Sequence, residues 1–541
     1  MKRYIISSIV ALVGAIALNA QSAYDAESMV NTDLNGTARY VGMGGAMGAL
    51  GADLSTMGSN PAGTGLMRSS DMSVSFGGVF TGHSGVLNKD AGRASLDQAG
   101  VLFALGGDGG SVRNINFGVN YQKRRNFLSN LDTWLNLNGG SQTFQLAEMA
   151  NAAYQDGMNY GYLVDAVIPY ADNCRKETKG GVTKWTEDYH QGIILDNYYT
   201  TVGYDADKVS TNDYLNRFNS YKDGKLNTYG FFGVGATESN YRRATYGNNA
   251  QVDINVSTNI EDKVFLGLSV GVYTMSYDRQ TAYYEKGTDG NTYQIDNWYH
   301  NSADGIDVKF GAIFRPIDDS PFRFGIHVHT PIWYSFRDYN TLYVDALDFR
   351  RESDVFNYRF RTPWKFGASL GHTFDNVLAI GIDYEFQDYS TSKYYTNHGD
   401  DINLTGSNEN IRANLRASHT LKVGMEFKPS PEWAIRLGYN LVTSPFKNNA
   451  YNYLDYSSTF TETDYTNWGA TNRLTFGLGY RFKGGYFDLA YQLQLQKGKF
   501  YAYDYDGVVY GDVGGSANLS IAPTEITNNR SHIMATIVFK F

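Results

Sequence analysis

The chain has 541 residues, and its 43 Tyr, 30 Phe and 58 Gly against only 10 Pro favour strands and turns. A single cysteine, Cys174, excludes an internal disulfide. The net charge of −9 argues against nucleic acid or another polyanion as a partner. The mean hydropathy of −0.39 does not exclude a membrane protein, because a barrel with a polar lumen and long wet loops is not apolar on average.

Residues 1–20 have the three parts of a secretory signal peptide. Lys2 and Arg3 precede an apolar run from Ile5 to Leu18, and Ala20 supplies a small residue before the expected cut. Without this segment the chain would hold 44 basic and 55 acidic residues, a net charge of −11. We therefore exclude it from the fold. After it, no apolar run reaches the roughly 18 residues of a helical membrane span.

A glycine-rich segment, residues 39–65, precedes the first expected strand. Glycine adopts backbone conformations closed to other residues, so such a segment can fold tightly in a confined space. A turn signal ends it. A dinucleotide-binding loop is rejected here, because no strand precedes the glycines in a βαβ unit. We predict that residues 21–69 form a plug inside a β-barrel, with these gating residues: Gly42, Gly44, Gly45, Asn60, Pro61, Ala62 and Gly63.

Residues 70–541 are predicted to form an all-β, 14-stranded antiparallel transmembrane barrel. Segments of about ten residues alternate between apolar and polar side chains, which is typical of strands with one face in lipid and the other in water. Ile382 and Tyr384 share one such face, for example, and Asp383 and Glu385 share the other. The fourteen candidates are 71–80, 97–106, 112–124, 245–257, 263–276, 306–316, 321–335, 358–374, 376–390, 411–428, 432–446, 470–483, 485–500 and 529–541.

The links between these segments alternate in length. Tight turns such as Asp375-Asn376 and Lys483-Gly484 alternate with long polar links, of which 125–244 is the largest. In outer-membrane barrels the short turns are periplasmic and the long loops extracellular, which would place both termini in the periplasm. Within the largest link, 142–154 is predicted to form an amphipathic helix. This link is either a compact cap without a ligand role or a binding element.

Polar residues on two groups of strands are candidates for a site in the lumen. His327 and His329 share a strand face but have no supporting ligand at a suitable spacing, so we assign no metal site. No Ser/His/Asp order, paired-carboxylate motif or Walker loop is specific enough to predict an enzyme or a cofactor. Four arginines are expected to face the lumen on strands ten to twelve. They either pair with carboxylates and fill the barrel or bind a ligand carboxylate: Arg412, Arg416, Arg436 and Arg473.

The last segment alternates up to an aromatic residue at the C-terminus. Ile533, Ala535, Ile537, Phe539 and Phe541 face one way. This end is similar to the C-terminal signal by which outer-membrane barrels are handed to their assembly machinery. We expect Phe539 and Phe541 to serve as that signal, and the alternative is an ordinary final strand.

The signal peptide, the glycine-rich segment ending in Asn60-Pro61-Ala62-Gly63, the fourteen strands and the terminal Phe together resemble the FadL family of outer-membrane transporters for hydrophobic compounds. The specific likeness covers Ala38 to Leu66 and, more loosely, the final strand. It implies that the plug is a hatch. It also implies that a hydrophobic substrate enters the lumen from outside and leaves sideways through a gap at a kinked strand. Gly118 in the third strand is a candidate for that kink, because glycine weakens a strand and permits a bend.

The resemblance and the residues leave two functions open. The first is passive uptake of small hydrophobic molecules, of the long-chain fatty acid or aromatic hydrocarbon type, across the outer membrane of a Gram-negative bacterium. Its partners would be outer-membrane lipid, the substrate and the barrel assembly machinery. The second is a FadL-like barrel that docks a protein on its extracellular loops as a scaffold in a secretion or envelope complex. Transport predicts an apolar cavity from the loops to the hatch and a gap in the wall near strand three.

Overall fold

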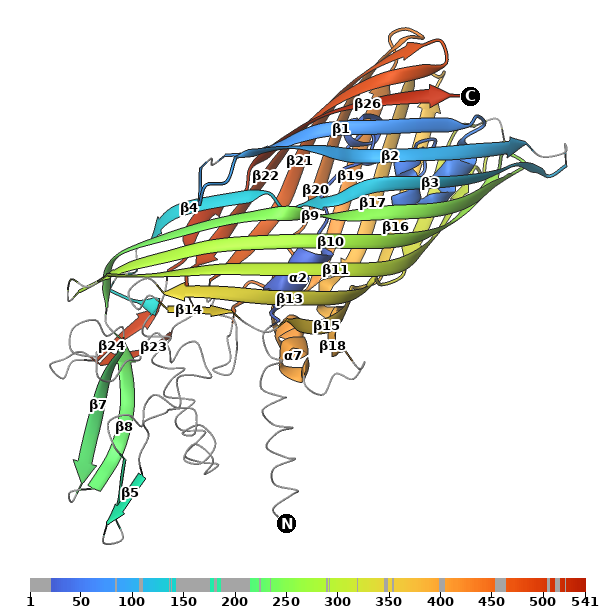
Figure 1. Ribbon diagram of the computed structural model, residues 1–541. Coiled ribbons are helices and arrows are strands. Elements are labelled where there is room, and N and C mark those ends of the chain that lie inside the picture. Colours follow the sequence, from blue (N-terminus) through green and yellow to red (C-terminus); the bar gives the residue numbers. More distant parts are fainter. Residues whose placement is uncertain are drawn as a thin grey trace, which may run out of the picture.

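A closed antiparallel β-barrel surrounds the N-terminal part of the chain in the computed structural model (Figure 1). The structure describes residues 21–541 apart from 83–84, 107–109, 136, 138, 143–175, 180–181, 186–214, 223–224, 234, 289, 291, 319, 345–348, 353–354, 398–403, 453–463, 504–505, 511–515 and 521. Among the described residues, no helix is long and apolar enough to cross a membrane.

One 20-stranded sheet forms the barrel wall, and several of its strands lie end to end. The chain therefore runs along the wall from one end of the barrel to the other fourteen times, and we call each pass a crossing. The barrel closes where β1 (Asp71–Thr81) pairs with β26 (Arg530–Lys540). The other wall strands are β2 (Gly92–Gly106), β3 (Val112–Asn126), β4 (Ser129–Leu135), β9 (Ala236–Ile260), β10 (Val264–Gly287), β11 (Thr292–Phe314), β12 (Arg323–His329), β13 (Trp333–Val344), β14 (Phe349–Glu352), β15 (Phe356–Arg361), β16 (Lys365–Phe374), β17 (Leu378–Asp388), β18 (Lys393–Thr396), β19 (Ala417–Phe427), β20 (Trp433–Val442), β21 (Tyr465–Phe482), β22 (Gly485–Tyr501) and β25 (Thr524–Thr527).

The long links carry smaller elements of their own. Separate two-stranded ladders lie at one end of the barrel, beyond β14 in Figure 1. They are β5 (Lys176–Lys179) with β6 (Val182–Trp185), β7 (Leu215–Lys222) with β8 (Lys225–Gly233), and β23 (Asp506–Tyr510) with β24 (Ser516–Ser520). The 3-10 turn η7 (Tyr389–Thr391) and the helix α7 (Thr405–Asn414) lie at the same end, between β17 and β19. The helix predicted at 142–154, except for its first residue, lies outside the described residues, as does much of the link 125–244.

All fourteen predicted segments correspond to crossings of the wall, so the predicted fold is confirmed. The tight turns follow hairpin chemistry: Asp375 and Asn376 have φ of 45° and 58°, as a two-residue turn between twisted strands requires. One segment is wrong at its start. Residues 411–416 are not strand, because α7 runs to Asn414 and β19 begins only at Ala417.

Apolar side chains cover the outward face of the wall on every crossing. Each of the following is more than a third exposed and points away from the lumen: Phe76, Phe103, Phe117, Ile254, Leu268, Phe310, Ile326, Leu370, Ile382, Val423, Leu437, Leu474, Leu489 and Ile533. A continuous apolar surface of this kind is unfavourable in water and matches the hydrocarbon core of a membrane. Aromatic residues such as Trp433 and Tyr480 lie at its edge near the short turns.

The N-terminal segment lies in the lumen and forms short helices (Figure 1). They are α2 (Ala23–Val30), α3 (Ala38–Gly42), η1 (Leu54–Gly58) and η2 (Pro61–Leu66). We call residues 21–69 the hatch. Ser22 opens α2 with a capping box to Asp25, and Asn60 caps η2, whose first residue is Pro61.

The hatch spans the length of the lumen. Tyr24 stacks on Phe446 and contacts Tyr465 at the end of the barrel that carries the long links. Phe541, in contrast, contacts Phe103 and bonds to Ser70 at the end with the short turns. The described N-terminal end and the C-terminus thus lie at opposite ends of the barrel, because the hatch passes through the barrel before β1 begins. The periplasmic placement of both termini stays a prediction.

Candidate functional site

The turn at Asn60 lies directly against the backbone of the barrel wall. The side chain of Asn60 accepts a hydrogen bond from Ala62 N at 3.2 Å and donates to Gly48 O at 2.8 Å. A Cβ atom on Gly267 would lie 2.3 Å from the carbonyl carbon of Pro61, and one on Gly311 would lie 2.0 Å from Asn60 Oδ1. Only glycine fits in the wall at these two positions, so the wall is shaped to the hatch.

The predicted hatch glycines make similarly close contacts. Gly44 has φ of 63°, and a Cβ there would lie 2.9 Å from Tyr439 N in β20. A Cβ on Gly42 would lie 3.1 Å from the backbone of Gly477. Gly45 and Gly63 instead face other hatch residues. The structure thus brings all seven predicted gating residues together in a closely packed plug, and their gating role remains a prediction.

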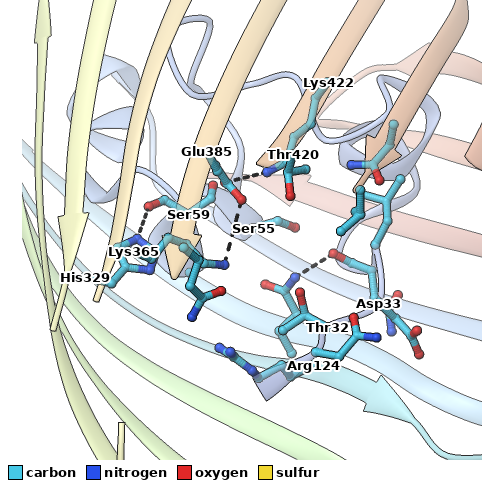
Figure 2. A pocket seen from close by; sticks show the side chains of 18 of the residues that line it. Thr32, Asp33, Ser55, Ser59, Arg124, His329, Lys365, Glu385, Thr420 and Lys422 are labelled. Atoms are coloured by element: carbon cyan, nitrogen blue, oxygen red, sulfur yellow. Dashed lines mark hydrogen bonds and ion pairs between the residues drawn. The ribbon is translucent and has the colours of Figure 1, made fainter. Parts of the chain in front are cut away.

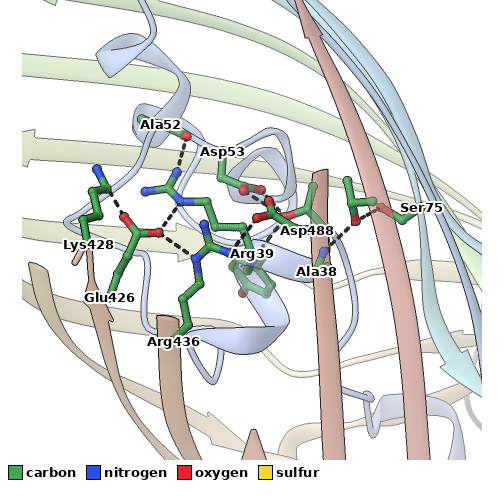
Figure 3. Close-up of polar contacts among 12 residues, drawn as sticks. Ala38, Arg39, Ala52, Asp53, Ser75, Glu426, Lys428, Arg436 and Asp488 are labelled. Carbon is green, nitrogen blue, oxygen red and sulfur yellow. Dashed lines mark hydrogen bonds and ion pairs between the residues drawn. The ribbon is translucent and has the colours of Figure 1, made fainter. Parts of the chain in front are cut away.

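Buried ion pairs hold the hatch at the short-turn end (Figure 3). Arg39 of α3 donates through Nε to Glu426 at 3.1 Å and through Nη1 to Ala52 O at 2.7 Å. Arg436 of β20 binds Glu426 at 2.7 Å and Asp488 at 2.6 Å. Because each charge is compensated, this group of four residues is a structural anchor. Arg436 therefore fits the ion-pair interpretation and is not free for a ligand.

The end of the hatch is tied to the short turn between β9 and β10. Arg68 Nη2 lies 2.9 Å from Asp262 Oδ1. Asn259 donates to the same carboxylate at 2.7 Å. The hydrogen bond from the Asn259 amide has the larger effect and Arg68 the smaller, and together they lower the pKa of Asp262.

Two of the four predicted lumen arginines do not face the lumen. Arg412 is exposed on α7, and Arg416 is exposed between α7 and β19, where its Nε donates to Ser444 O. The prediction is wrong for both because it extended the alternation of β19 back through a helical turn. Arg473 does face inward and donates to Gln494, Asn440 and the carbonyl of Thr32. Among the described residues it has no carboxylate within ion-pair distance.

A polar cavity of about 100 Å³ lies between the hatch and the wall (Figure 2). Hatch residues 31–35 form one side of it, and charged side chains from the wall form the other. Lys422 binds Glu385 at 2.5 Å, and Lys365 lies 3.8 Å from the same carboxylate. Arg124 and Arg473 also line the cavity, so cationic groups outnumber the carboxylates Asp33 and Glu385 around it. The expected apolar cavity is therefore not found at this point of the lumen.

The two histidines lie beside this cavity. His329 Nε2 is 2.6 Å from the carbonyl of Ser59, and His327 Nε2 is 3.7 Å from Glu385 Oε1. Their rings are 5.1 Å apart. In the described part of the chain, no three His, Cys, Asp or Glu residues are grouped as a metal site would need.

An inward-facing aromatic cluster occupies the lumen at the long-link end. We call it the aromatic vestibule, and it was not predicted because inward positions of a barrel are expected to be polar. The small residues Ala23 and Ala26 of α2 pack into it, together with Met29 and Val30. Its wall members are Tyr273, Tyr334, Phe336, Tyr358, Phe360 and Tyr394. All six are nearly inaccessible to solvent, so α2 fills an apolar chamber.

The wall has an unpaired edge between β2 and β3. Their ladder ends at the pair Gln98–Gln122. Beyond it, β2 continues to pair with β1 back to Gly92, and β3 continues to pair with β9 as far as Asn126. We call this edge the seam. A bulge between Lys123 and Arg125 bends β3 there.

Hatch residues cover the seam from inside. Asp33 N donates to the carbonyl of Arg124, and its carboxylate accepts from Asn126 N at 2.8 Å. Asn35 accepts from Gln122 Nε2 and donates to Asp97 of β2 at 3.2 Å. The hatch therefore bridges both sides of the unpaired edge.

Gly118 does not mark the break in strand three. It lies within the uninterrupted ladder, opposite Leu102 of β2 and Asn255 of β9. A Cβ there would lie 2.4 Å from Met57 Cε in η1, so the position is close to the hatch. The predicted kink at Gly118 is wrong, because the bulge near Arg124 bends the strand instead.

The C-terminal strand has the expected phase. Ile533, Phe539 and Phe541 are exposed on the outward face, and Phe541 is 66% exposed. The structure does not test recognition by an assembly machinery, which stays a prediction.

No protein-family model and no curated protein matches the chain. Solved structures do match. A FadL homologue from Pseudomonas aeruginosa has a TM-score of 0.50 and 12% identity, over 94% of this chain and 99% of that chain. The toluene transporters TodX of Pseudomonas putida and TbuX of Ralstonia pickettii match with TM-scores of 0.43 and 0.45 and identities of 11% and 12%, over 94% of this chain and 99% of each of theirs. The chain thus has the outer-membrane barrel fold of the FadL homologue, which confirms the resemblance at the level of fold.

Proposed function

We propose that this protein is an outer-membrane channel for passive uptake of small hydrophobic molecules. The observation that carries the proposal is the aromatic vestibule. It is an apolar chamber inside the barrel, and α2 of the same chain fills it. A lumen that conducted only polar solutes would gain nothing from six buried aromatic side chains. The vestibule offers a hydrophobic molecule the surface that α2 now covers.

The route continues from the vestibule to the seam. Residues 31–35 follow α2 directly and both line the polar cavity and cover the seam. When α2 leaves the vestibule, it pulls on the segment that closes the seam, so entrance and lateral exit open together. The solved transporters of similar fold that carry toluene support this class of substrate.

The cationic lining of the cavity favours a substrate with an acidic head. Arg473 is held by neutral groups, and Arg124 lies over the ring of Tyr273 at 5.4 Å. Either guanidinium can bind a carboxylate in a bidentate geometry. We therefore place long-chain fatty acids before aromatic hydrocarbons as substrates.

A disulfide between α2 and α7 tests the proposal. Ala23 N donates to Asn410 Oδ1 at 2.9 Å, so Ala23→Cys with Asn410→Cys, in a Cys174→Ser background, joins two adjacent positions. We expect the oxidised protein to lose uptake of a labelled long-chain fatty acid and the reduced protein to regain it. Each single cysteine variant is a matched control that cannot form the link. Full uptake by a completely crosslinked protein would refute the proposal.

The alternative, a docking scaffold, rests on the link 125–244, most of which lies outside the described residues. Deletion of residues 143–214 separates the two functions. The channel predicts retained uptake, whereas the scaffold predicts loss of a protein that co-purifies with the intact chain.

A further inference from the structure

Three adjacent crossings of the wall are interrupted at the same level. The chain leaves the strand conformation at 330–332 between β12 and β13, at 362–364 between β15 and β16, and at 389–392 between β17 and β18. Pro331 and Pro363 lie in the first two breaks, where proline removes a ladder donor. The interruptions lie at the long-link half of the barrel, where Figure 1 shows β15 and β18 beside α7.

The breaks leave an apolar pocket of about 500 Å³ on the outside of the wall. Pro331, Pro363, Trp364, Phe366 and Phe386 line it. Trp364 and Phe366 are each 49% exposed and belong to the outward apolar surface. The pocket therefore opens toward the hydrocarbon of the membrane, where the acyl chains of lipids surround it.

Arginines lie on the same outward face, on the side of the pocket away from the short turns. Arg361 lines the pocket and lies opposite Trp333 of β13. Arg359 precedes Arg361 by two residues and lies on the same face of β15. Arg337 of β13 lies opposite Asn357, which is two residues before Arg359. Arg337 and Arg359 are exposed. We call the three arginines the outer basic patch.

The outer basic patch lacks carboxylate partners in the part of the chain that the structure describes. No ion pair joins Arg337, Arg359 or Arg361 to an Asp or Glu there, and Arg361 lies over the ring of Tyr395 at 5.8 Å. The one carboxylate that lines the pocket, Asp388, accepts hydrogen bonds from the backbone and the hydroxyl of Ser390. Among the described residues, no carboxylate competes with an anion for these three guanidinium groups.

We propose that the pocket and the outer basic patch together bind a phosphorylated lipid of the outer leaflet. Its acyl chain lies between Trp364 and Phe366, and its phosphate is held by Arg359 and Arg361. Guanidinium groups bind phosphate through paired N–H donors, and an arginine beside aromatic side chains at the interface stays over the lipid headgroups. The site is outside the lumen, so it is independent of the proposed transport.

Lipid titration followed by native mass spectrometry of the folded barrel in a neutral detergent tests the site. The probe is bisphosphoryl lipid A, and its dephosphorylated form serves as the second ligand. We expect Arg359→Gln with Arg361→Gln to weaken binding of the bisphosphoryl form by about tenfold or more, since hydrogen bonds to charged groups contribute this much. The dephosphorylated lipid should bind weakly to both proteins. Trp364→Ala should weaken both lipids.

Arg113→Gln with Arg481→Gln is the matched control, because both residues are exposed at the short-turn end of the barrel. Equal weakening by this control, or equal affinity for the two lipids, would overturn the proposal. Inorganic phosphate distinguishes a lipid site from a free-anion site. Complete displacement of the lipid by millimolar phosphate, with no effect of Trp364→Ala, would also overturn it. Heat-shifted gel mobility shows that each variant has folded.

Discussion

Replacement of Gly267 by alanine should push the hatch off the wall. The added Cβ would lie 2.3 Å from both the carbonyl carbon and oxygen of Pro61, and 2.4 Å from Ala62 N. These are backbone atoms, so no side-chain rotation relieves the contact. Overpacking of a closely packed interior costs about 1–3 kcal/mol. We expect the free energy of unfolding in urea, measured from lipid vesicles, to fall by about that amount, and the conductance of the barrel in planar bilayers to rise.

Gly106→Ala is the matched control for that variant. Gly106 also lies in a wall strand, but no atom lies within 4 Å of the Cβ it would gain. Both substitutions remove the same backbone freedom, so the difference between them isolates the contact with the hatch. If the two variants have equal stability and equal conductance, the Asn60–Ala62 turn is not seated on β10 and our account of the plug fails.

Three further variants, the first with a matched control, test other parts of the lumen and the wall. Arg436→Met leaves two carboxylates without this partner and should cost about 3–5 kcal/mol in urea unfolding, whereas Arg416→Met, at an exposed position, should change stability by less than about 0.5 kcal/mol. Asp33→Ala removes the acceptor of Asn126 N at the seam and should raise uptake of a fluorescent fatty acid, and unchanged uptake would contradict a closing role. Deletion of Phe541 should lower the amount of barrel in the outer membrane while the purified chain still refolds in detergent, and a normal amount would show that the residue is not an assembly signal.

The barrel was predictable because the two faces of each strand meet different surroundings. Where β17 faces lipid on one side and the lumen on the other, Ile382 and Asp383 must differ in polarity, and the alternation is visible in the sequence. Beyond the membrane both faces meet polar surroundings, so this contrast fades. That is why β9, predicted at 245–257, extends over Ala236–Ile260. The prediction that residues 411–416 are strand failed for a related reason. A short amphipathic helix next to a strand continued the alternation by chance.

The contents of the lumen could be predicted only in part. The turn at Asn60-Pro61 was visible because its residues have strong local preferences. The glycines that contact it, Gly267 and Gly311, lie 207 and 251 residues after Asn60 and have no local signal, since their small size matters only in the assembled barrel. The aromatic vestibule was missed because Tyr334 and Phe336 alternate with exposed residues as any wall strand does. Only their contact with α2 distinguishes an inward apolar face from an outward one.

The two halves of the hatch differ in how they are held, and this difference locates the moving part. Arg39 is bound at 3.1 Å to a carboxylate that is itself paired with Arg436, and the turn at Pro61 lies against wall backbone. The ion pairs of the first half are longer, at 3.8 Å between Asp25 and Arg279 and 3.4 Å between Asp33 and Arg530.

The two alanines that α2 packs into the vestibule, Ala23 and Ala26, give up little contact area when they leave it. Low local stability is a property of elements that move in function. We therefore infer that residues 21–35 open the route while residues 39–66 stay in place, in which case the seven predicted gating residues seat the plug and do not move. A disulfide between the Asn60 turn and the wall should then leave uptake intact, whereas the disulfide between α2 and α7 should abolish it. Loss of uptake with the first link alone would show that the whole hatch must shift.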